Sequence, residues 1–284
     1  MSKVAVITDS TAYIPDNLVK SLSITVAPQV LIWGEETFRD GVDILPDEFY
    51  KRLKTAKVMP TTSQISIGDM KTEFETLLES GYDVLGIFIS SKLSGTIQSA
   101  TQARELLPKA ADRISIVDSD STAMAMGFHV LTAARAAQAG ASLAECRKMA
   151  EESRAHTGVY FVVDTLEFLR RGGRIGGAQA LLGSALNIKP ILELRNGRIE
   201  SIEKVRTKGK AIERMIDLVV HHIGDRKPVR LATLHANAET EAREALSKAT
   251  LQIQPVETIF ASVSPVIGTH AGPGTIGLAF MAGL

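Results

Sequence analysis

Apolar and polar residues in the first half of the chain alternate in a way that predicts strands and helices in turn. Residues 4–8, 84–90 and 113–117 are short runs rich in Val and Ile, which is typical of buried strands. Helices with one apolar face are expected to start near residue 16 and to cover about residues 47–55, 69–79, 94–107, 122–137 and 143–155. This alternation predicts a parallel, doubly wound α/β sheet that is covered by helices on both faces.

Local signals refine this pattern. Ser66 and Ser142 are expected to cap the helices that follow them, and Ser142 is expected to form a capping box with Glu145. An extended segment with two Gly-containing turns predicts a small β excursion near residues 24–45. Residues 60–64, Pro-Thr-Thr-Ser-Gln, are expected to form a polar loop between two helices.

The second half of the chain predicts a mixed α/β unit. Strands are expected at residues 159–163, 190–195, 198–205, 229–234 and 257–261, and helical segments at residues 166–171, 176–186, 209–222 and 239–248. Asn196-Gly197 is a strong hairpin signal between two of these strands. We therefore predict a Rossmann-like N-terminal domain, residues 1–158, a mixed-sheet C-terminal domain, residues 159–284, and a ligand between them.

Composition narrows the classes of function. The 284 residues carry 32 basic and 32 acidic side chains, so no overall field attracts nucleic acid or an anionic membrane. A single cysteine, Cys146, excludes an internal disulfide and a cysteine-based zinc site. The apolar run at residues 4–7 is too short for a signal peptide, and no apolar stretch is long enough for stable membrane insertion. We expect a cytoplasmic protein with no nucleic-acid partner.

Polar residues follow three of the predicted parallel strands. They lie at residues 9–11, 91–96 and 118–121, and ligands of open α/β sheets bind at the carboxyl ends of the strands. Ser94 and Thr96 offer hydroxyl donors, and Gly95 allows close approach to the backbone at a helix N-terminus, which favours an anion. The alternative interpretation is that Ser94 only caps the helix.

Other motifs give alternatives of different chemistry. His270 lies in a loop of small residues, and Ser94 and His270 could form a nucleophile and base with Asp9 or Asp118 as orienting acid. No Gly-x-Ser-x-Gly motif occurs, so a hydrolase is the second hypothesis. No His-x-x-x-His pair occurs, and no metal site is predicted. Glycines 272, 274 and 277 match a dinucleotide pattern, but no acidic residue follows them to bind a ribose.

Basic residues gather at two places in the second half. Arg170, Arg171 and Arg174 surround two glycines, and Arg206 follows the predicted hairpin with two lysines nearby. Such a group is either a solvated surface or a docking patch for an acidic or phosphate-bearing partner.

Several segments together resemble the DegV family of bacterial proteins that bind fatty acids. They are Thr8-Asp-Ser10, Thr62-Ser-Gln64, Ser90-Ser-Lys-Leu-Ser-Gly-Thr96, the segment Leu-Glu-Phe-Leu-Arg-Arg-Gly-Gly-Arg-Ile at residues 166–175, Lys189-Pro-Ile-Leu192, Lys204-Val-Arg-Thr207, and the segment Ser-Pro-Val-Ile-Gly-Thr-His-Ala-Gly-Pro-Gly at residues 264–274. The resemblance implies a two-domain α/β fold with a long-chain fatty acid held between the domains. It also implies a carrier without catalytic activity or cofactor. A separate ATP-binding subunit of a fatty acid kinase would phosphorylate the carried acid, which then enters phospholipid synthesis.

The resemblance also implies roles for individual residues. The carboxylate-binding residues of the family correspond to Thr62, Ser94 and His270, and the arginines that engage the kinase correspond to Arg174 and Arg206. Supporting ligand contacts are expected from three neighbours of these residues: Gly95, Thr96 and Thr269. Two residues depart from the family pattern: Ile65 stands in place of a usual proline, and Ala125 in place of a usual glycine.

Physical arguments agree with a lipid carrier. Burial of one methylene contributes roughly 0.8 kcal/mol, so a long acyl chain gains about 10 kcal/mol before the costs of association. A buried carboxylate must keep its hydrogen bonds, and two hydroxyls, an imidazole and a helix N-terminus suit this demand.

Overall fold

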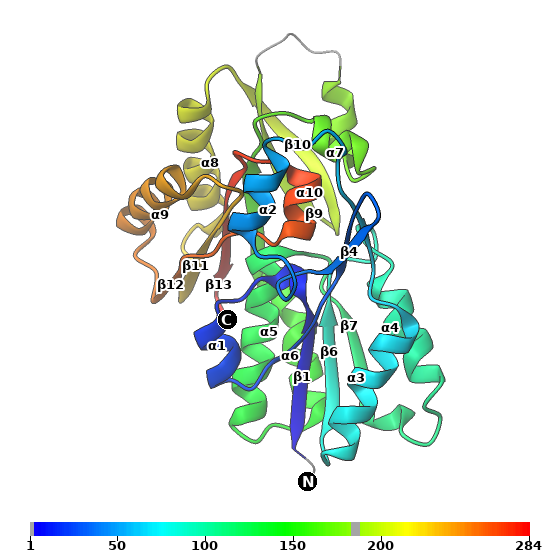
Figure 1. Ribbon diagram of the computed structural model, residues 1–284. Coiled ribbons are helices and arrows are strands. Elements are labelled where there is room, and N and C mark those ends of the chain that lie inside the picture. Colours follow the sequence, from blue (N-terminus) through cyan, green and yellow to red (C-terminus); the bar gives the residue numbers. More distant parts are fainter. Residues whose placement is uncertain (1–2, 183–187) are drawn as a thin grey trace.

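The computed structural model describes residues 3–182 and 188–284, in which two large sheets and one small sheet are stacked along the molecule (Figure 1). The first sheet has the order β2-β1-β6-β7, and all its strand pairs are parallel. Its strands are β1 (Val4–Asp9), β2 (Thr25–Ala27), β6 (Asp83–Phe88) and β7 (Ile114–Asp118). The predicted parallel sheet is confirmed.

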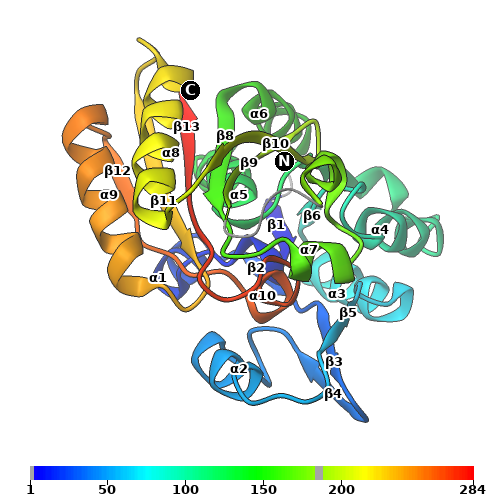
Figure 2. The ribbon, with the colours of Figure 1, turned by 90° about the horizontal axis from the view of Figure 1, so that it is seen from above.

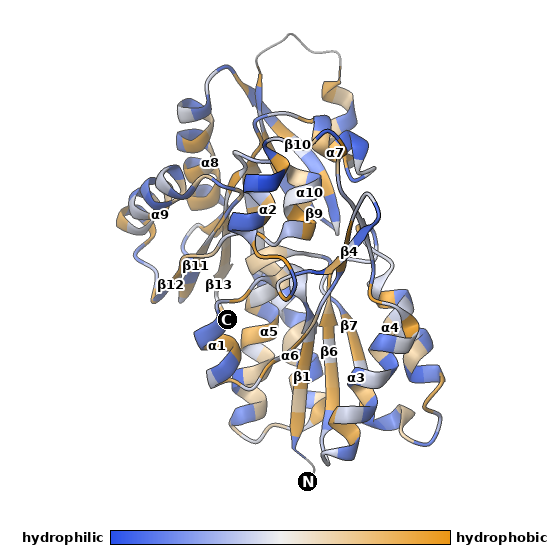
Figure 3. Ribbon diagram, viewed as in Figure 1, coloured by the Kyte–Doolittle hydropathy of each residue, from blue (hydrophilic) through white to orange (hydrophobic). Residues whose placement is uncertain are grey.

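Helices cover both faces of this sheet because successive strand residues point to opposite sides. Val6 packs into the cluster that contains α5 (Ala123–Gln138) and α6 (Leu143–His156). Its neighbour Ile7 packs into the cluster with α3 (Ile67–Glu79) and α4 (Thr96–Glu105). Figure 3 shows the strands as a hydrophobic layer between helices whose outer faces are polar. The predicted caps at Ser66 and Ser142 are both present.

The second sheet has the order β10-β9-β8-β13-β11-β12, and only its β11–β12 pair is parallel. Its strands are β8 (Thr157–Val162), β9 (Lys189–Arg195), β10 (Arg198–Val205), β11 (Val229–His235), β12 (Glu257–Ile259) and β13 (Ile276–Ala282). One face is covered by α8 (Lys208–Ile223) and α9 (Glu239–Ile253). The other face shares a core with α5, so the two sheets enclose a common interior. The predicted mixed sheet and its Asn196-Gly197 hairpin are confirmed.

A small antiparallel sheet, in the order β4-β3-β5, projects from one side of the molecule together with α2 (Pro46–Leu53) (Figure 2). Its strands are β3 (Val30–Trp33), β4 (Glu36–Arg39) and β5 (Thr61–Ser63). The predicted loop at residues 60–64 is wrong, because Thr62 pairs with Leu31 across the β3–β5 ladder. A three-residue polar edge strand has no hydrophobic alternation, so the pattern of this segment could not reveal it.

The remaining short elements connect these layers. They are η1 (Ser10–Ala12), α1 (Asp16–Ser21), η2 (Ala111–Arg113), α7 (Glu167–Arg171), η3 (Gly176–Leu181) and α10 (Pro265–Ala271). The predicted helix at residues 176–186 is a 3₁₀ segment that ends at Leu181, and residues 183–186 of that prediction lie outside the described residues. Gly176 has a positive φ of 51°, and an added Cβ would lie 2.3 Å from the Ile199 carbonyl oxygen, so the backbone departs from an α-helix here.

Candidate ligand-binding site

A cavity of about 180 Å³, which we call the central cavity, lies where the two large sheets, β5 and α10 meet. Most of its wall is apolar. The apolar lining residues are Ile89, Leu93, Ala123, Val159, Phe161, Leu169, Leu194, Ile199, Leu234, Val263, Val266, Ile267 and Ala271. The polar lining residues are Thr11, Gln29, Thr62, Ser63, Gln64, Ser94, Thr122, Arg174, His270 and Thr275. A cavity with an apolar body and a few polar side chains suits an amphipathic molecule.

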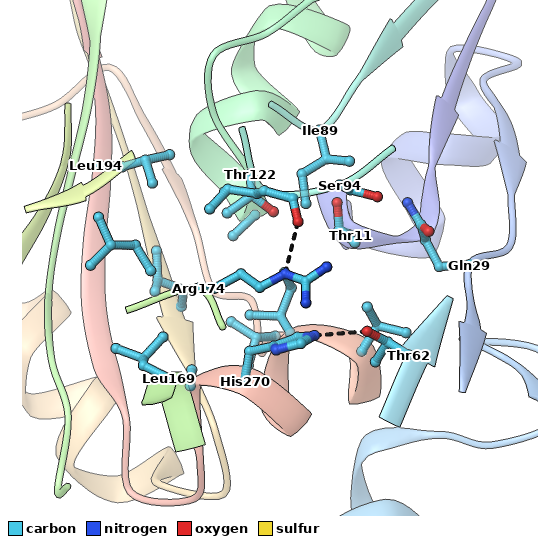
Figure 4. A pocket seen from close by; sticks show the side chains of 18 of the residues that line it. Thr11, Gln29, Thr62, Ile89, Ser94, Thr122, Leu169, Arg174, Leu194 and His270 are labelled. Atoms are coloured by element: carbon cyan, nitrogen blue, oxygen red, sulfur yellow. Dashed lines mark hydrogen bonds between the residues drawn. The ribbon is translucent and has the colours of Figure 1, made fainter. Parts of the chain in front are cut away.

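Two of the predicted site residues are in direct contact. Thr62 on β5 and His270 on α10 are 208 positions apart, yet the Thr62 Oγ1 and His270 Nε2 atoms are 2.7 Å apart (Figure 4). Ser94, at the carboxyl end of β6, lines the same cavity. The three residues predicted to bind a carboxylate therefore face one space.

His270 is a neutral hydrogen-bonding group at neutral pH. Burial, and to a smaller extent the charge of Arg174, lowers the pKa of His270 to about 4. Its Nδ1 atom is buried and has no hydrogen-bond partner among the described residues. A Cβ added to Gly172 would lie 2.0 Å from this Nδ1 atom, so the glycine allows the α7 segment to pack against the imidazole. This close approach fixes the ring from behind.

Ser94 does not cap the helix that follows it. Gly95 occupies the N-cap position of α4 without a side-chain hydrogen bond, and the Ser94 hydroxyl is 2.9 Å from Thr96 Oγ1. Gln29 Nε2 donates to the same Thr96 oxygen at 2.8 Å. A Cβ on Gly95 would lie 2.5 Å from the Gln64 amide oxygen. The simple capping interpretation of Ser94 is therefore wrong, and its hydroxyl belongs to a polar network beside the cavity.

Arg174 lies closer to the cavity than the sequence suggested. Its Nε donates to the Leu93 carbonyl oxygen at 3.0 Å, and its guanidinium also donates to the Gly172 carbonyl. It is the only lysine or arginine that lines the central cavity within residues 3–182 and 188–284. Figure 4 shows the guanidinium between Ser94 and His270. Pattern analysis placed Arg174 in a basic surface cluster, and only the turn at Gly172-Gly173 directs it inward.

The other predicted residues lie around the site rather than in it. Thr96 is buried in α4, and the Thr269 hydroxyl donates to the Pro265 carbonyl oxygen within α10. Arg206 is exposed just beyond β10 and forms no ion pair with a described residue. Thr11, which belongs to the polar segment predicted at residues 9–11, also lines the cavity, and so does Thr122, which lies one residue beyond the predicted segment 118–121. Both follow strand ends, and this signal could also have identified Thr122.

The two departures from the family pattern lie in the core. Ile65 is 2% exposed and packs into the cluster between the first sheet and α3. Ala125 is 1% exposed near the start of α5. Neither lines the central cavity.

The arrangement expected for a serine hydrolase is not assembled among the described residues. Ser94 bonds to Thr96 rather than to His270. Asp9 accepts the backbone N–H groups of Thr11 and Ile89, at 3.0 and 2.8 Å, and makes no hydrogen bond to His270. The Asp118 carboxylate likewise accepts backbone N–H groups from two loop residues. Both aspartates hold loops rather than orient a base.

Within the described part of the chain, no three His, Cys, Asp or Glu side chains gather in a way that could hold a metal ion. None of the described helices combines the length and the apolar character needed to span a bilayer.

Comparison with known proteins decides the family. The sequence profile described as "Uncharacterised protein, DegV family" matches residues 3–283. Protein DegV of Bacillus subtilis (strain 168) is 38% identical over 278 residues, which cover 97% of this chain and 98% of that protein. The chain belongs to the DegV family. The resemblance inferred from its motifs is confirmed.

Solved structures of DegV proteins share the fold. A DegV family protein from Thermus thermophilus, whose structure is described by its fatty acid binding, has a TM-score of 0.93 and 34% identity, with 99% of both chains covered. Bacillus subtilis DegV, described as a fatty acid binding protein, has a TM-score of 0.90 and 37% identity, with 99% of this chain and 100% of that chain covered. These descriptions give no support to the hydrolase hypothesis.

Proposed function

We propose that this DegV protein binds a long-chain fatty acid in the central cavity, with the carboxylate at Thr62, Ser94 and His270. The observation that carries the proposal is the joining of an apolar cavity to this polar cluster, which holds the 2.7 Å contact between Thr62 and His270. Two structural relatives above 30% identity are described as fatty-acid-binding proteins, which supports the same ligand class.

The polar cluster provides what a carboxylate needs in a mostly apolar space. An ionised carboxylate accepts several hydrogen bonds, and its burial is costly without them. The hydroxyls of Thr62 and Ser94 and one imidazole N–H are donors, and the Arg174 guanidinium adds positive charge at the cavity wall. Because burial lowers the pKa of His270 to about 4, the imidazole is neutral at pH 7 before the acid binds and has one N–H to donate. The hydrocarbon chain then packs against the apolar wall of the central cavity between the sheets. Binding in this way requires no cofactor of the protein's own.

Extraction of the purified protein and mass spectrometry of the extract test the ligand class. We expect a long-chain fatty acid in an amount comparable to that of the protein. Direct titration then tests the head group: Thr62→Val should weaken binding of the fatty acid but not of the fatty alcohol with the same chain. Thr61→Val is the matched control, because Thr61 is exposed and lies next to Thr62 on β5. Equal loss for acid and alcohol would contradict the carboxylate site.

We also propose that the bound acid is presented to a separate ATP-dependent kinase subunit, so that this chain carries substrate without catalysing its phosphorylation. Such a carrier would act in the cytoplasm and feed phospholipid synthesis. The described residues near the carboxylate site form no serine triad, and Arg206 is an exposed cation without an ion pair among them. Together with Arg174, Arg206 is proposed to contact the kinase.

Substitution of Arg206 separates lipid binding from presentation. Arg206→Ala should leave fatty-acid affinity unchanged and reduce phosphorylation of the bound acid by the partner kinase. Arg198→Ala is the matched control, because Arg198 is an exposed arginine at the opposite end of β10. Normal phosphorylation of the Arg206→Ala protein would contradict the docking role while leaving the lipid site intact.

A further inference from the structure

A second cavity lies apart from the proposed fatty-acid site. It has a volume of about 620 Å³ and shares no lining residue with the central cavity. We call it the acidic groove. Its lining residues are Thr8, Ser10, Ala12, Tyr13, Ile14, Pro15, Asp16, Val19, Val26, Pro28, Asp40, Gly41, Val42, Leu45, Pro46, Asp47, Phe260, Ala261 and Ser262. They come from the end of β1 and η1, from α1 and the residues before it, from β2 and the residue after it, from the stretch between β4 and the start of α2, and from the segment after β12.

The charged side chains that line the acidic groove are all acidic, and one cation of the described chain, Arg243, packs its guanidinium on the ring of Phe260 in the groove wall. Three aspartates line it, Asp16, Asp40 and Asp47, and its described lining contains no lysine, arginine or histidine. Asp16 and Asp47 are exposed, and neither forms an ion pair within the described residues. Like charges in one concave surface reinforce each other and attract a cation.

Asp40 is the most deeply buried of these three carboxylates. It is 1% exposed and accepts hydrogen bonds from Ser10 Oγ at 2.6 Å and from the Val266 backbone N–H at 3.4 Å. Burial is the main reason that the pKa of Asp40 is raised to about 6, so the carboxyl group is largely ionised above neutral pH. No cation of the described chain is paired with it. A buried carboxylate held only by neutral donors is stabilised further by a positive charge placed nearby.

A neutral polar group in the same wall is also without a partner. Thr8 is fully buried, and its Oγ1 has no hydrogen-bond partner among the described residues. An unsatisfied buried hydroxyl destabilises the folded protein, and a donor or acceptor on a ligand would offset this cost. This observation is independent of the carboxylates and points to an occupant with hydrogen-bonding capacity.

The rim of the acidic groove is apolar. Val26, Val42 and Leu45 line it with exposed fractions of 38%, 55% and 54%, although side chains of this kind are usually more buried. A hydrated metal ion would gain nothing from such a rim, and no described group of three ligands could hold one. A hydrocarbon chain attached to the cation would instead cover this apolar rim and remove it from water.

We propose that the acidic groove is a second ligand site for a small alkylammonium molecule, whose ammonium group lies among Asp16, Asp40 and Asp47 while its hydrocarbon covers Val26, Val42 and Leu45. An ammonium group donates three hydrogen bonds and carries the charge that the described lining lacks. The apolar rim selects an amine with a short hydrocarbon chain over a bare inorganic cation. The site is independent of the central cavity and of the function proposed there.

Calorimetric titration of the full-length protein at pH 8 with n-hexylammonium chloride tests this site, with 1-hexanol as the uncharged probe of equal chain length. We expect saturable binding of one hexylammonium, at least about tenfold tighter than binding of hexanol. Asp16→Asn/Asp47→Asn should weaken hexylammonium at least about fivefold, since both exposed carboxylates face the groove. Asp112→Asn/Asp225→Asn, which removes two exposed carboxylates elsewhere, should leave the affinity unchanged.

Three results would overturn the proposal. The first is hexylammonium binding that does not saturate below about 10 mM. The second is an affinity for hexanol within about twofold of the affinity for hexylammonium. The third is an equal loss of hexylammonium affinity in the two double variants. Two controls accompany the titration. Thermal unfolding checks that all variants remain folded, and fatty-acid titration checks that the central cavity is unaffected. Failure here would leave the proposed carrier function untouched.

Discussion

Two histidines of this protein, His129, which is fully buried, and His270, which is partly buried, have similar hydrogen bonds and yet belong to very different regions. His129 on α5 lies between the two large sheets, and its Nε2 is 2.7 Å from Thr157 Oγ1. His270 on α10 lies at the central cavity, and its Nε2 is 2.7 Å from Thr62 Oγ1. Each has a buried Nδ1 without a partner among the described residues, and burial lowers the pKa of each, to about 3 for His129 and about 4 for His270.

The two histidines differ in the further hydrogen bonds of their threonine partners. Thr157 Oγ1 also donates to the Ser153 carbonyl oxygen at 3.0 Å, so it accepts from His129 Nε2, and both directions of the bond are fixed. Thr62 has no second side-chain partner among the described residues, so its hydroxyl can turn toward a ligand while the imidazole of His270 keeps its position. Burial and a lowered pKa are common to both histidines. Two features distinguish His270, which we propose to bind a ligand: it borders a cavity, and the hydroxyl of its partner Thr62 makes no further side-chain hydrogen bond among the described residues.

The largest effect is expected from His129→Ala. This change removes a fully buried side chain and should lower the free energy of unfolding by about 2–4 kcal/mol. The fatty-acid affinity of the folded protein should stay within about twofold of the wild type. Urea unfolding and fatty-acid titration measure the two quantities. A large loss of affinity without loss of stability would place His129 in the ligand site and break the comparison.

His270→Ala should show the opposite pattern. Loss of a hydrogen bond to a charged group costs about 1.5–3 kcal/mol, so fatty-acid affinity should fall roughly 10- to 100-fold. The affinity for a fatty alcohol of equal length should change much less. Titration of both lipids measures the ratio. An unchanged ratio would show that His270, like His129, has only a structural role.

A smaller effect is expected from Gly172→Ala. The new Cβ would lie 2.0 Å from His270 Nδ1 and must displace the ring, so fatty-acid affinity should fall by roughly fivefold. Gly209→Ala is the matched control, because a Cβ at Gly209 in α8 meets no atom within 4 Å. Equal affinities of the two variants would mean that the exact position of the imidazole does not matter.

The last effect concerns acid stability. The unfolded chain protonates both histidines near pH 6.5, whereas the folded protein keeps them neutral to pH values of about 3 and 4. The unfolded state therefore binds more protons in this range, and both groups lower stability as the pH falls below 6.5. Asp40, with its pKa raised to about 6, acts in the opposite direction between pH 6 and 3.8.

Single variants isolate the contribution of the histidines to this pH dependence. The loss of unfolding free energy between pH 7 and pH 5, measured in urea without lipid, should be smaller for His129→Gln and His270→Gln than for the wild type. NMR titration of the two imidazoles in the wild type gives the pKa values directly. Ordinary values near 6.5 for both would show that burial does not hold them neutral.

The local pattern of the sequence determined much of the fold. Continuous Val- and Ile-rich runs predicted β1, β6 and β7, and the alternating helices predicted a parallel sheet with two covered faces. The caps at Ser66 and Ser142 and the Asn196-Gly197 hairpin were also predictable. These features depend on residues within a few positions of each other, so periodicity and capping chemistry suffice. Local pattern also indicated Ser94 and His270 as candidates, whereas Thr62 and the carboxylate-binding role of all three came from the family resemblance.

Tertiary structure alone decided how these residues meet. The polar strand β5 exists because β3 offers it a partner, and this pairing carries Thr62 to within 2.7 Å of a histidine 208 positions away. The turn at Gly172-Gly173 directs Arg174 toward the central cavity, although its sequence context is that of a surface cation. The three aspartates of the acidic groove come from two segments, α1 and the stretch from the end of β4 to the start of α2. Contacts between distant segments depend on how whole layers pack, and no local pattern in the sequence records that packing.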